Sequence, residues 1–543
     1  MPDLVRDALA DLDARLAVRG VVIWTGAEPT FTRRESVEPW WLFEAVGPGA
    51  GEKLARAEAV AAALARRLGG RFESVPGRQY PDEDAPRFAI AVRWARDPAL
   101  GTAALTITPD PGVVEVNAAP CANGVAFLDH ARDVYAAAAE AGLSPLRWRF
   151  HGEVVDSGGG GQITLGGPSG EASPFFVHPA LLPRMVRYLN DHPSLSYWFL
   201  GEHAGSACQS PRADEGVRER WEELLLACAT LERIVRLGAV GPELLWSTLA
   251  PLLVDASGNS HRAEINVEKL WNAHLGERGR MGCVELRAFR MAPTPEMLAA
   301  AAALVRAVAA RCALAPYRST PRDWGGELHD RMALPSQLRA DLDEVLADLA
   351  AHDLALGPHL EAQIDAFRGE PMWSGRIGTA NVTLTRAVEL WPLLGDVASQ
   401  ERATSRSVDA STERLEIVSD QPGAVEIAGR VIALRTVPEG HVLGLRRRVY
   451  QPRAGLHAAL PPLDPLALRV VTGGAAIGLR VHGWKPGGGA YEGLPADAAE
   501  AARRRAERVV AGEPEPAAPL AGARRAAWTI DLRDLVLEEN PPT

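Results

Sequence analysis

The sequence lacks the features on which several protein classes depend. Its five cysteines lie far apart in 543 residues and form no CxxC pair, so we expect neither a disulfide framework nor a structural zinc site. A dispersed, odd set of cysteines is typical of reduced thiols in the cytoplasm. Positive charge is not in excess, because Lys+Arg 58 against Asp+Glu 69 gives a formal net charge of -11. Binding to nucleic acid or to an anionic membrane is therefore not expected, since both need surplus positive charge.

Long hydrophobic runs and common catalytic motifs are also missing. The most apolar stretch, 297–315, contains Arg306 and Arg311, so it predicts a packed helix and not a membrane span. The first 20 residues carry acidic side chains throughout, unlike the basic and apolar regions of an export signal. No GxxxxGKS/T, HExxH or GxSxG motif is present, and no GxGxxG follows a strand pattern. These absences argue against a P-loop NTPase, a zincin and an α/β-hydrolase.

The hydrophobic pattern changes along the chain and predicts an α+β fold with more than one domain. Over roughly the first 320 residues, strand-like runs alternate with Ala-rich helical patterns, whereas beyond about residue 370 strands are separated by Gly, Pro and Asp. Predicted strands include 88–94, 103–107, 381–384, 414–418 and 468–471, and predicted helices include 52–68, 127–141, 334–353 and one that Thr294 would cap. We predict a first domain at 1–325, a helical connector at 326–370 and a β-rich C-terminal domain at 371–543.

Several predicted strands carry a carboxylate beside a second polar group on one face. Side chains of a strand alternate between its faces, so residues two positions apart lie together. The groups that share a face are Glu115 with Asn117, Arg262 with Glu264, Asn266 and Glu268, and Glu285 with Arg287, while Glu28 lies at a strand end. Taken singly, each pattern is more simply explained by a solvated sheet face with surface ion pairs. Gathered together, the carboxylates would repel each other unless divalent cations lay between them, and oxygen-only ligands suit Mg²⁺ or Mn²⁺.

Two loops also carry candidate binding groups. The segment 156–167 has four consecutive glycines followed by an apolar strand pattern, which favours close approach of the backbone to a ligand over a flexible linker. In 209–215, Arg212 would either clamp a phosphate or carboxylate or form an ordinary salt bridge with Asp214 or Glu215. The sequence favours neither role for Arg212.

Eight sequence blocks, taken in order, resemble a family of amidoligases. The blocks are GAEPTF, TPDPGVVEVN, SGGGGQITLGG, HPSLSYWF, CQSPRADE, GNSHRAEINVEKLW, VELRAF and WGGELHDR. The family belongs to the glutamine synthetase and glutamate–cysteine ligase superfamily, and the resemblance extends over nearly the whole chain. It includes the HGWKPGGGAY segment of the C-terminal part.

The resemblance implies a glutamine synthetase-like antiparallel sheet that is bent into a funnel, flanked by helices and followed by the smaller β-rich C-terminal domain. Strand carboxylates would hold two or more Mg²⁺ (or Mn²⁺) around ATP. The γ-phosphate would pass to a substrate carboxylate, and an amine would attack the acyl phosphate to leave an amide, ADP and phosphate. Such chemistry needs positioning and charge neutralisation more than a side-chain nucleophile.

The resemblance also implies a role for individual residues. The implied metal ligands are Glu28, Glu115, Glu264 and Glu285, with Asn117 and Glu268 as further candidates. Arg212 and Arg287 would be the catalytic residues that offset charge on the transferring phosphoryl group. Gly160, Gln162, Arg262 and Asn117 would contact the nucleotide. Small-molecule or peptide carboxylates and amines are the implied partners, with no nucleic acid or membrane partner, a cytoplasmic location, and a homo-oligomer left open.

One departure from the family pattern supports competing hypotheses. Where the family has Asn-His after the glycines, this chain has Gly161 and Gln162. Glutamine offers an amide oxygen or N–H but does not titrate near neutral pH. The main alternative is therefore a catalytically weakened nucleotide-binding or partner-docking protein on the same fold. A phosphotransferase that stops at the phosphorylated product is a third hypothesis.

Overall fold

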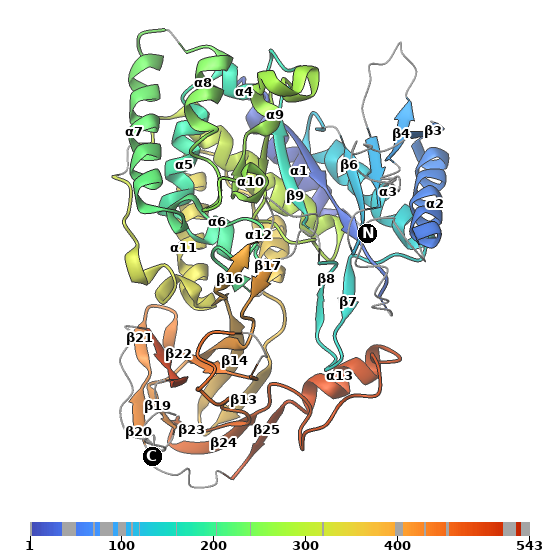
Figure 1. Cartoon of the computed structure of the whole chain (residues 1–543). Coiled ribbons are helices and arrows are strands. Elements are labelled where there is room, and N and C mark those ends of the chain that lie inside the picture. The colour runs from blue at the N-terminus through green and yellow to red at the C-terminus, as the bar shows by residue number, and fades with distance from the viewer. Residues whose placement is uncertain are drawn as a thin grey trace.

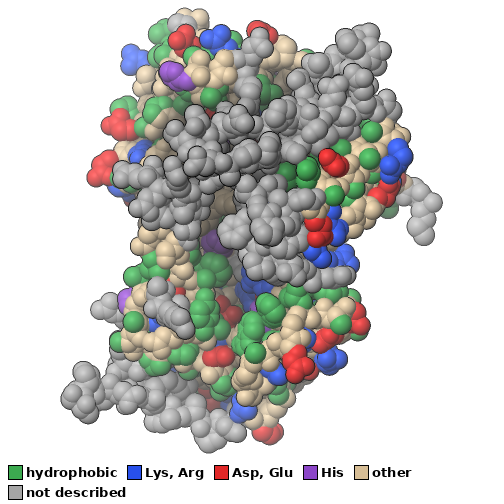
Figure 2. Space-filling view, turned by 45° about the vertical axis from the view of Figure 1, so that its right-hand side comes forward, with side chains coloured by type: hydrophobic (Ala, Val, Ile, Leu, Met, Phe, Trp, Pro, Cys, Tyr) green, Lys and Arg blue, Asp and Glu red, His purple; other side chains and the backbone are tan. Residues whose placement is uncertain are grey.

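The computed structural model describes most of the chain, in two halves that Figure 1 shows one above the other. The described residues are 3–34, 50–68, 71–75, 91–95, 105–109, 112–118, 120–158, 160–201, 203–238, 240–317, 320–396, 406–427, 430–451, 455–513 and 528–533. We call 3–368 the N-terminal half and 373–533 the C-terminal half. On the face in Figure 2, Lys and Arg side chains are interspersed with Asp and Glu.

Two antiparallel sheets lie side by side in the N-terminal half. The first has the order β1 (Trp24–Glu28), β9 (Gln162–Gly166), β12 (Val284–Leu286) and β11 (Ile265–Asn266). The second has the order β2 (Thr30–Phe31), β6 (Val114–Ala118), β5 (Leu105–Thr108), β4 (Ala91–Ala95) and β3 (Arg71–Val75). The chain passes from one sheet to the other at Pro29, whose carbonyl accepts from the Val116 N–H at 2.9 Å. Thr25 and Cys121 add two backbone hydrogen bonds, so the β1–β2 segment joins the sheets.

Helices cover these sheets. Most of them share one hydrophobic core with the first sheet, whereas α2 and part of α3 form a second core with the other sheet. The helices of this half are α1 (Leu4–Val18), α2 (Ala50–Leu68), α3 (Gly124–Glu140), α4 (Pro174–Val177), α5 (Leu181–Asp191), α6 (Ser194–Tyr197), α7 (Arg218–Val235), α8 (Pro242–Leu249), α9 (Glu268–Trp271), α10 (Pro295–Leu314), α11 (Pro335–Ala351) and α12 (Pro358–Asp365). α10 begins where predicted, because the Thr294 hydroxyl accepts from the Met297 N–H at 3.2 Å. α10 is long and apolar enough to cross a membrane, but 89% of its most apolar window is buried in the protein, as in a core helix.

The C-terminal half is built from strands around a separate core. One sheet has the order β13 (Trp373–Ile377), β14 (Ala380–Ala387), β18 (Thr412–Ser419), β22 (Gly440–Arg448) and β21 (Arg435–Val437), with β26 (Thr529–Asp531) parallel to β22. The other has the order β20 (Arg430–Ala433), β19 (Gly423–Ile427), β23 (Leu466–Thr472), β24 (Ala475–Val481) and β25 (Val509–Gly512). Leu466, Leu468 and Val470 alternate inward along β23, as a sheet with one buried face requires. The helix α13 (Ala498–Ala506) and the hairpin of β16 (Leu393–Asp396) and β17 (Arg406–Val408) complete this half.

Two small pairings complete the strands of the N-terminal half. β7 (Leu146–Trp148) and β8 (Val154–Asp156) form a hairpin that extends toward α13 (Figure 1). β10 (His203–Ala204) pairs in parallel with β15 (Glu389–Leu390) and links the two halves. The residues predicted as a connector, 326–370, pack into the N-terminal core through Leu338, Leu360 and Phe367. The domain boundaries themselves stay a prediction.

Most of the predicted elements are present, with one consequential exception. The predicted strands at 88–94 and 103–107 overlap β4 and β5, although 88–90 and 103–104 lie outside the described residues. The predicted strand at 262–268 is wrong. Ser260–Arg262 form a 3₁₀ turn, β11 is limited to Ile265–Asn266, and α9 begins at Glu268. The reason is local capping: the side chains of Asn259 and Asn266 accept from the backbone two residues ahead.

Candidate functional site

Three neighbouring strands bring a pair of glutamates and a glutamine to one face of the first sheet. In the antiparallel register of β1 and β9, Glu28 lies opposite Gln162. β12 pairs with the other side of β9, and Glu285 lies opposite Thr164. Because Gln162 and Thr164 are two residues apart, they point to the same face. Segments that are far apart in the sequence therefore meet at this point through strand order.

Gln162 lies between the two carboxylates and hydrogen-bonds to both. The positions of its amide nitrogen and oxygen are assigned from their hydrogen-bond partners, with the nitrogen toward the two carboxylates and the oxygen toward Arg287. The amide nitrogen donates to Glu28 Oε2 at 2.6 Å and to Glu285 Oε1 at 2.8 Å, and the amide oxygen accepts from Arg287 Nη2 at 2.9 Å. Arg287 also forms an ion pair with Glu285. The predicted residues Glu28, Gln162, Glu285 and Arg287 thus form one connected network.

Lys269 is part of the same network and was not predicted. Its Nζ lies 2.8 Å from Glu28 Oε1 and 3.3 Å from Glu285 Oε2, so one ammonium group bridges the two carboxylates. The sequence did contain one signal, because lysine is rare in this chain. Among its 58 Lys and Arg residues the lysines are Lys53, Lys269 and Lys485.

The second sheet contributes a third carboxylate near this pair. Glu115 lies in β6 opposite Thr30, and Asn117 Nδ2 donates to Glu115 Oε1 at 2.7 Å. We call Glu28, Glu115 and Glu285 the acidic cluster. It lies where the β1–β2 segment joins the two sheets, as expected for strands of one continuous surface.

The electrostatics of the acidic cluster show that its negative charge is only partly compensated. Glu28 is 9% exposed, and burial raises the pKa of its carboxyl to about 7, with further contributions from Glu285 and Glu115. The ammonium of Lys269 acts in the opposite direction. Burial alone would lower the pKa of Lys269, but Glu28 and Glu285 raise it. Lys269 therefore offsets only part of the negative charge that acts on Glu28.

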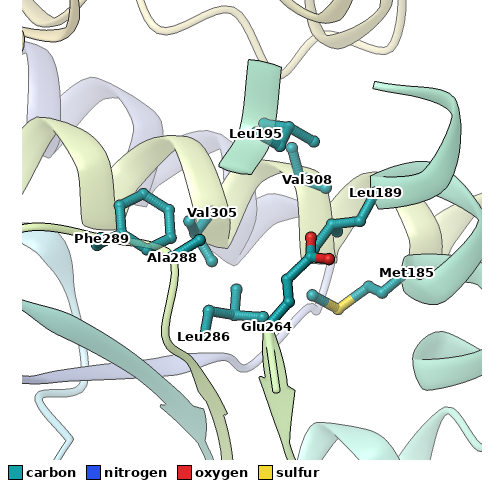
Figure 3. A pocket seen from close by; sticks show the side chains of 9 residues that line it. All are labelled: Met185, Leu189, Leu195, Glu264, Leu286, Ala288, Phe289, Val305 and Val308. Atoms are coloured by element: carbon teal, nitrogen blue, oxygen red, sulfur yellow. The ribbon is translucent and has the colours of Figure 1, made fainter. Parts of the chain in front are cut away.

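Glu264, predicted as a ligand beside these residues, lies elsewhere. Its side chain lines a small cavity with Met185 and Leu286, shown in Figure 3. Leu286 alternates with Glu285 along β12 and so faces the opposite side of the sheet. Glu264 Oε1 accepts from Ser196 Oγ at 2.5 Å. The prediction that Glu264 shares a strand face with Asn266 and Glu268 is wrong, because the segment 262–268 is not a continuous strand.

Burial in this cavity also changes the proton affinity of Glu264. The side chain is 4% exposed, and burial raises the pKa of its carboxyl to about 7 although Arg212 acts in the opposite direction. A carboxyl group in a largely apolar cavity is stabilised in its neutral form.

Arg212, predicted as a phosphate clamp or a salt bridge, forms the salt bridge. Its guanidinium is buried and binds Asp214 at 2.8 and 2.9 Å. It also donates to the carbonyls of Leu189 at 2.9 Å and Asn190 at 3.1 Å. A buried guanidinium needs such partners, so this arginine holds the loop in place, and its catalytic role stays a prediction.

The glycine run serves packing of the chain against itself. Gly161 donates to the carbonyl of Phe289 at 2.8 Å, and a Cβ at Gly161 would lie 2.6 Å from the carbonyl oxygen of Arg290. The carbonyl of Gly160 accepts from the Thr30 hydroxyl at 3.0 Å. These glycines therefore lie close to strand-end residues of the same chain, and the predicted approach of Gly160 to a ligand stays a prediction.

The two remaining candidates lie on either side of β11, Arg262 on the turn before it and Glu268 at the start of α9. Arg262 is the last residue of the 3₁₀ turn, and Glu268 forms an ion pair with His261 at 2.9 Å. Their predicted contacts with nucleotide or metal stay predictions.

The chain matches a known protein family over nearly its whole length. The model of a family described as "Putative amidoligase enzyme (DUF2126)" matches residues 3–104 and 99–533. A comparison with curated proteins finds no match. Among the solved structures that match is a GmaS/ADP complex in its conformation 1, with 16% sequence identity and a TM-score of 0.31. The match covers 67% of this chain and 73% of that chain.

Proposed function

This chain belongs to the DUF2126 family of amidoligase enzymes, and from this membership we propose that it is an ATP- and Mg²⁺-dependent carboxylate–amine ligase. The proposed substrates are an amine and the carboxylate of a small amino acid or peptide. In the proposed reaction a substrate carboxylate oxygen attacks the γ-phosphorus and ADP leaves. The amine nitrogen then attacks the acyl carbon, loses a proton, and phosphate leaves. The two joined antiparallel sheets support a glutamine synthetase-like funnel as the catalytic fold.

The single observation that carries this proposal is the convergence of the acidic cluster with Arg287. The donor set fits Mg²⁺, because carboxylate oxygens are the ligands that hard divalent cations prefer. The raised pKa of Glu28, caused by burial and by its acidic neighbours, also fits a place for a cation. Glu28, Glu115 and Glu285 would hold the ion. When bound, such an ion supplies charge neutralisation for phosphoryl transfer.

The chain's own residues would position the reacting groups. Arg287 projects from the end of β12 beside Glu285 and would bind oxygens of the transferring phosphoryl group. Gln162 holds the side chains of Glu28 and Glu285 in place through its amide. Asn117 does the same for Glu115 through its hydrogen bond. This arrangement stabilises developing negative charge without a side-chain nucleophile, as the reaction requires.

Glu285→Gln tests the proposed function directly. The variant should reduce ADP release at least about 100-fold, because the amide removes one negative charge from the acidic cluster. Its thermal unfolding and circular dichroism should stay near wild type. ADP release is measured with ATP, Mg²⁺ and panels of carboxylates and amines, each omitted in turn.

The control for this test is Glu222→Gln, which changes an exposed residue of α7 paired with Arg218. It should retain full turnover. A wild-type rate in Glu285→Gln would show that the proposed site is wrong.

A second candidate function follows from the hydrogen bonds and ion pairs that other side chains of the chain already make with Glu28 and Glu285. Donors from Gln162, Lys269 and Arg287 reach all four carboxylate oxygens of Glu28 and Glu285. Because all four oxygens already have partners within the chain, the alternative is a nucleotide-binding protein with weakened catalytic activity. That alternative predicts ATP binding by calorimetry with no ADP release in any substrate mixture, and sustained stoichiometric turnover would eliminate it.

A further inference from the structure

Lys269 lies between the carboxylates of Glu28 and Glu285. Its ammonium contacts one oxygen of Glu28 at 2.8 Å and one oxygen of Glu285 at 3.3 Å. The other oxygen of each glutamate is bound by Gln162. The two glutamates are therefore bridged twice, once by an amide and once by a full positive charge.

The backbone holds Lys269 at this position. Its carbonyl accepts from the N–H groups of Met281 at 3.0 Å and Cys283 at 3.3 Å, and the carbonyl of Leu270 accepts from Gly282 at 3.1 Å. The segment 281–283 leads directly into β12 and Glu285. The start of α9 is thus fixed to β12, which carries Glu285. The backbone therefore places the Lys269 side chain beside this glutamate.

The choice of lysine at this position is unusual for this chain. Lys+Arg number 58, and lysine occurs among them at positions 53, 269 and 485. A guanidinium presents a planar fork that pairs best with one carboxylate, whereas an ammonium is a compact point charge with three donors that two carboxylates can share. An ammonium therefore suits the bridging position between the two carboxylates.

We infer that the Lys269 ammonium is a built-in cation that replaces one divalent metal ion between Glu28 and Glu285, so that the site takes one divalent ion per chain. This inference rests on the proposed metal-dependent function and goes beyond it, because the family resemblance implies two or more ions. The charges of the cluster agree with it. Its three carboxylates exceed its two cations, Lys269 and Arg287, by one negative charge.

Calorimetric titration of the full-length protein with Mn²⁺ tests this inference. Wild type should bind one Mn²⁺ per chain, and Lys269→Met should bind two, because removal of the ammonium opens the position between the glutamates. Lys269→Arg, which keeps the charge, should still bind one. Lys485→Met removes an exposed lysine in contact with Tyr491 and serves as the matched control, with wild-type binding expected.

The outcomes separate the inference from the proposed function. An unchanged or lower Mn²⁺ stoichiometry in folded Lys269→Met would overturn the inference, and ATP- and Mg²⁺-dependent ADP release by wild type would still support the ligase. A second ion in Lys269→Met together with no ADP release from wild type would support the inference and contradict the ligase.

A measurement on wild type covers the case in which Lys269→Met does not fold. Protein labelled with ¹³C at lysine gives signals from the three lysines alone. Under saturating Mg²⁺, the Lys269 signal should stay distinct from that of exposed Lys485, because the ammonium keeps its ion pairs. A shift of the Lys269 signal to the Lys485 position would show that the metal displaces the lysine and would overturn the inference.

Discussion

At the scale of single residues, the two buried glutamates Glu28 and Glu264 have similarly raised pKa values in different surroundings. Burial is the main cause for both, and both are raised to about 7. Around Glu28, the charges of Glu285 and Glu115 also raise the pKa, and a bound cation would reduce the repulsion between these carboxylates. Around Glu264 the cavity wall is largely apolar, so the neutral acid is the preferred form. The same proton affinity therefore accompanies the proposed cation site in one case and a largely apolar cavity in the other.

The packing role of Glu264 predicts a pH-dependent stability. Its pKa is about 7 in the folded state against 4.5 as the ordinary value, so its contribution is fully present below about pH 4.5 and is lost as the pH rises through 7. Glu264→Gln should remove this loss and be more stable than wild type at pH 8, by about 3 kcal/mol at most. At pH 5 the two proteins should differ little. Urea unfolding at both pH values measures the difference.

Activity gives an independent check on Glu264. Because its carboxylate lies on the opposite side of the sheet from the acidic cluster, Glu264→Gln should retain most of the turnover. A loss comparable to that of Glu285→Gln would place Glu264 in the reaction after all. Lower stability of Glu264→Gln at pH 8 would mean that Arg212 needs an ionised partner there.

At the scale of elements, the glycine run positions β9 rather than a ligand. Gly161 lies against the backbone at Arg290 and Met291, directly before Gln162. The strand that carries Gln162 is held in register with β1 and β12 from this point on. Close backbone contact at the start of β9 therefore fixes the geometry of the acidic cluster.

Gly161→Ala should move β9 and weaken the site. The added Cβ would lie 2.6 Å from the Arg290 carbonyl oxygen, and such overpacking typically costs about 1–3 kcal/mol. We expect a lower melting temperature and weaker Mn²⁺ binding. Gly326→Ala is the matched control, because a Cβ there would contact nothing within 4 Å. Equal melting temperatures for the two variants would contradict the packing role of Gly161.

At the scale of the whole molecule, the β7–β8 hairpin ties the C-terminal half to the strand that carries Gln162. The tip of the hairpin contacts α13, where Arg504 donates to the carbonyl of Phe150 at 2.6 Å. A Cβ at Gly152 would lie 2.1 Å from the Ala501 carbonyl oxygen, so the contact is close. Glu153 forms an ion pair with Arg386 of β14. β8 leads through the glycine run into β9, which carries Gln162. Contacts of the hairpin with the C-terminal half therefore help to hold β9 in place.

Glu153→Gln should loosen this contact between the halves. Burial would raise the pKa of Glu153, but Arg386 and Arg508 lower it to about 2. The variant removes one of the two buried acids that face Arg386 and Arg508, the other being Glu413, and breaking a buried pair typically costs about 3–5 kcal/mol. We expect calorimetric unfolding to separate into two transitions, one for each half. A single transition at the wild-type temperature would contradict this coupling.

The pH dependence of the same contact has the opposite sign to that of Glu264. A lowered pKa means that the contribution of Glu153 is present above about pH 4.5 and is lost as the pH falls toward 2. Acid should therefore separate the two unfolding transitions of wild type in the way that Glu153→Gln does at neutral pH.

Local patterns in the sequence determined most of the elements and part of the site. Alternation along single strands correctly grouped Glu285 with Arg287 and Glu115 with Asn117, because a strand fixes which side chains share its face. The cap at Thr294 likewise located the start of α10. These features depend on residues that are close in sequence, so they could be predicted without the fold.

Tertiary structure alone decided which of these groups meet. The contact of Lys269 with Glu28 joins residues 241 positions apart and depends on the strand order β1-β9-β12, which no local pattern encodes. Tertiary contacts likewise gave Arg212 a buried salt bridge with Asp214, and β11 begins at Ile265, so Glu264 lies outside the strand. Periodicity specifies the face of one element, whereas a site built from several elements is specified only by how they pack.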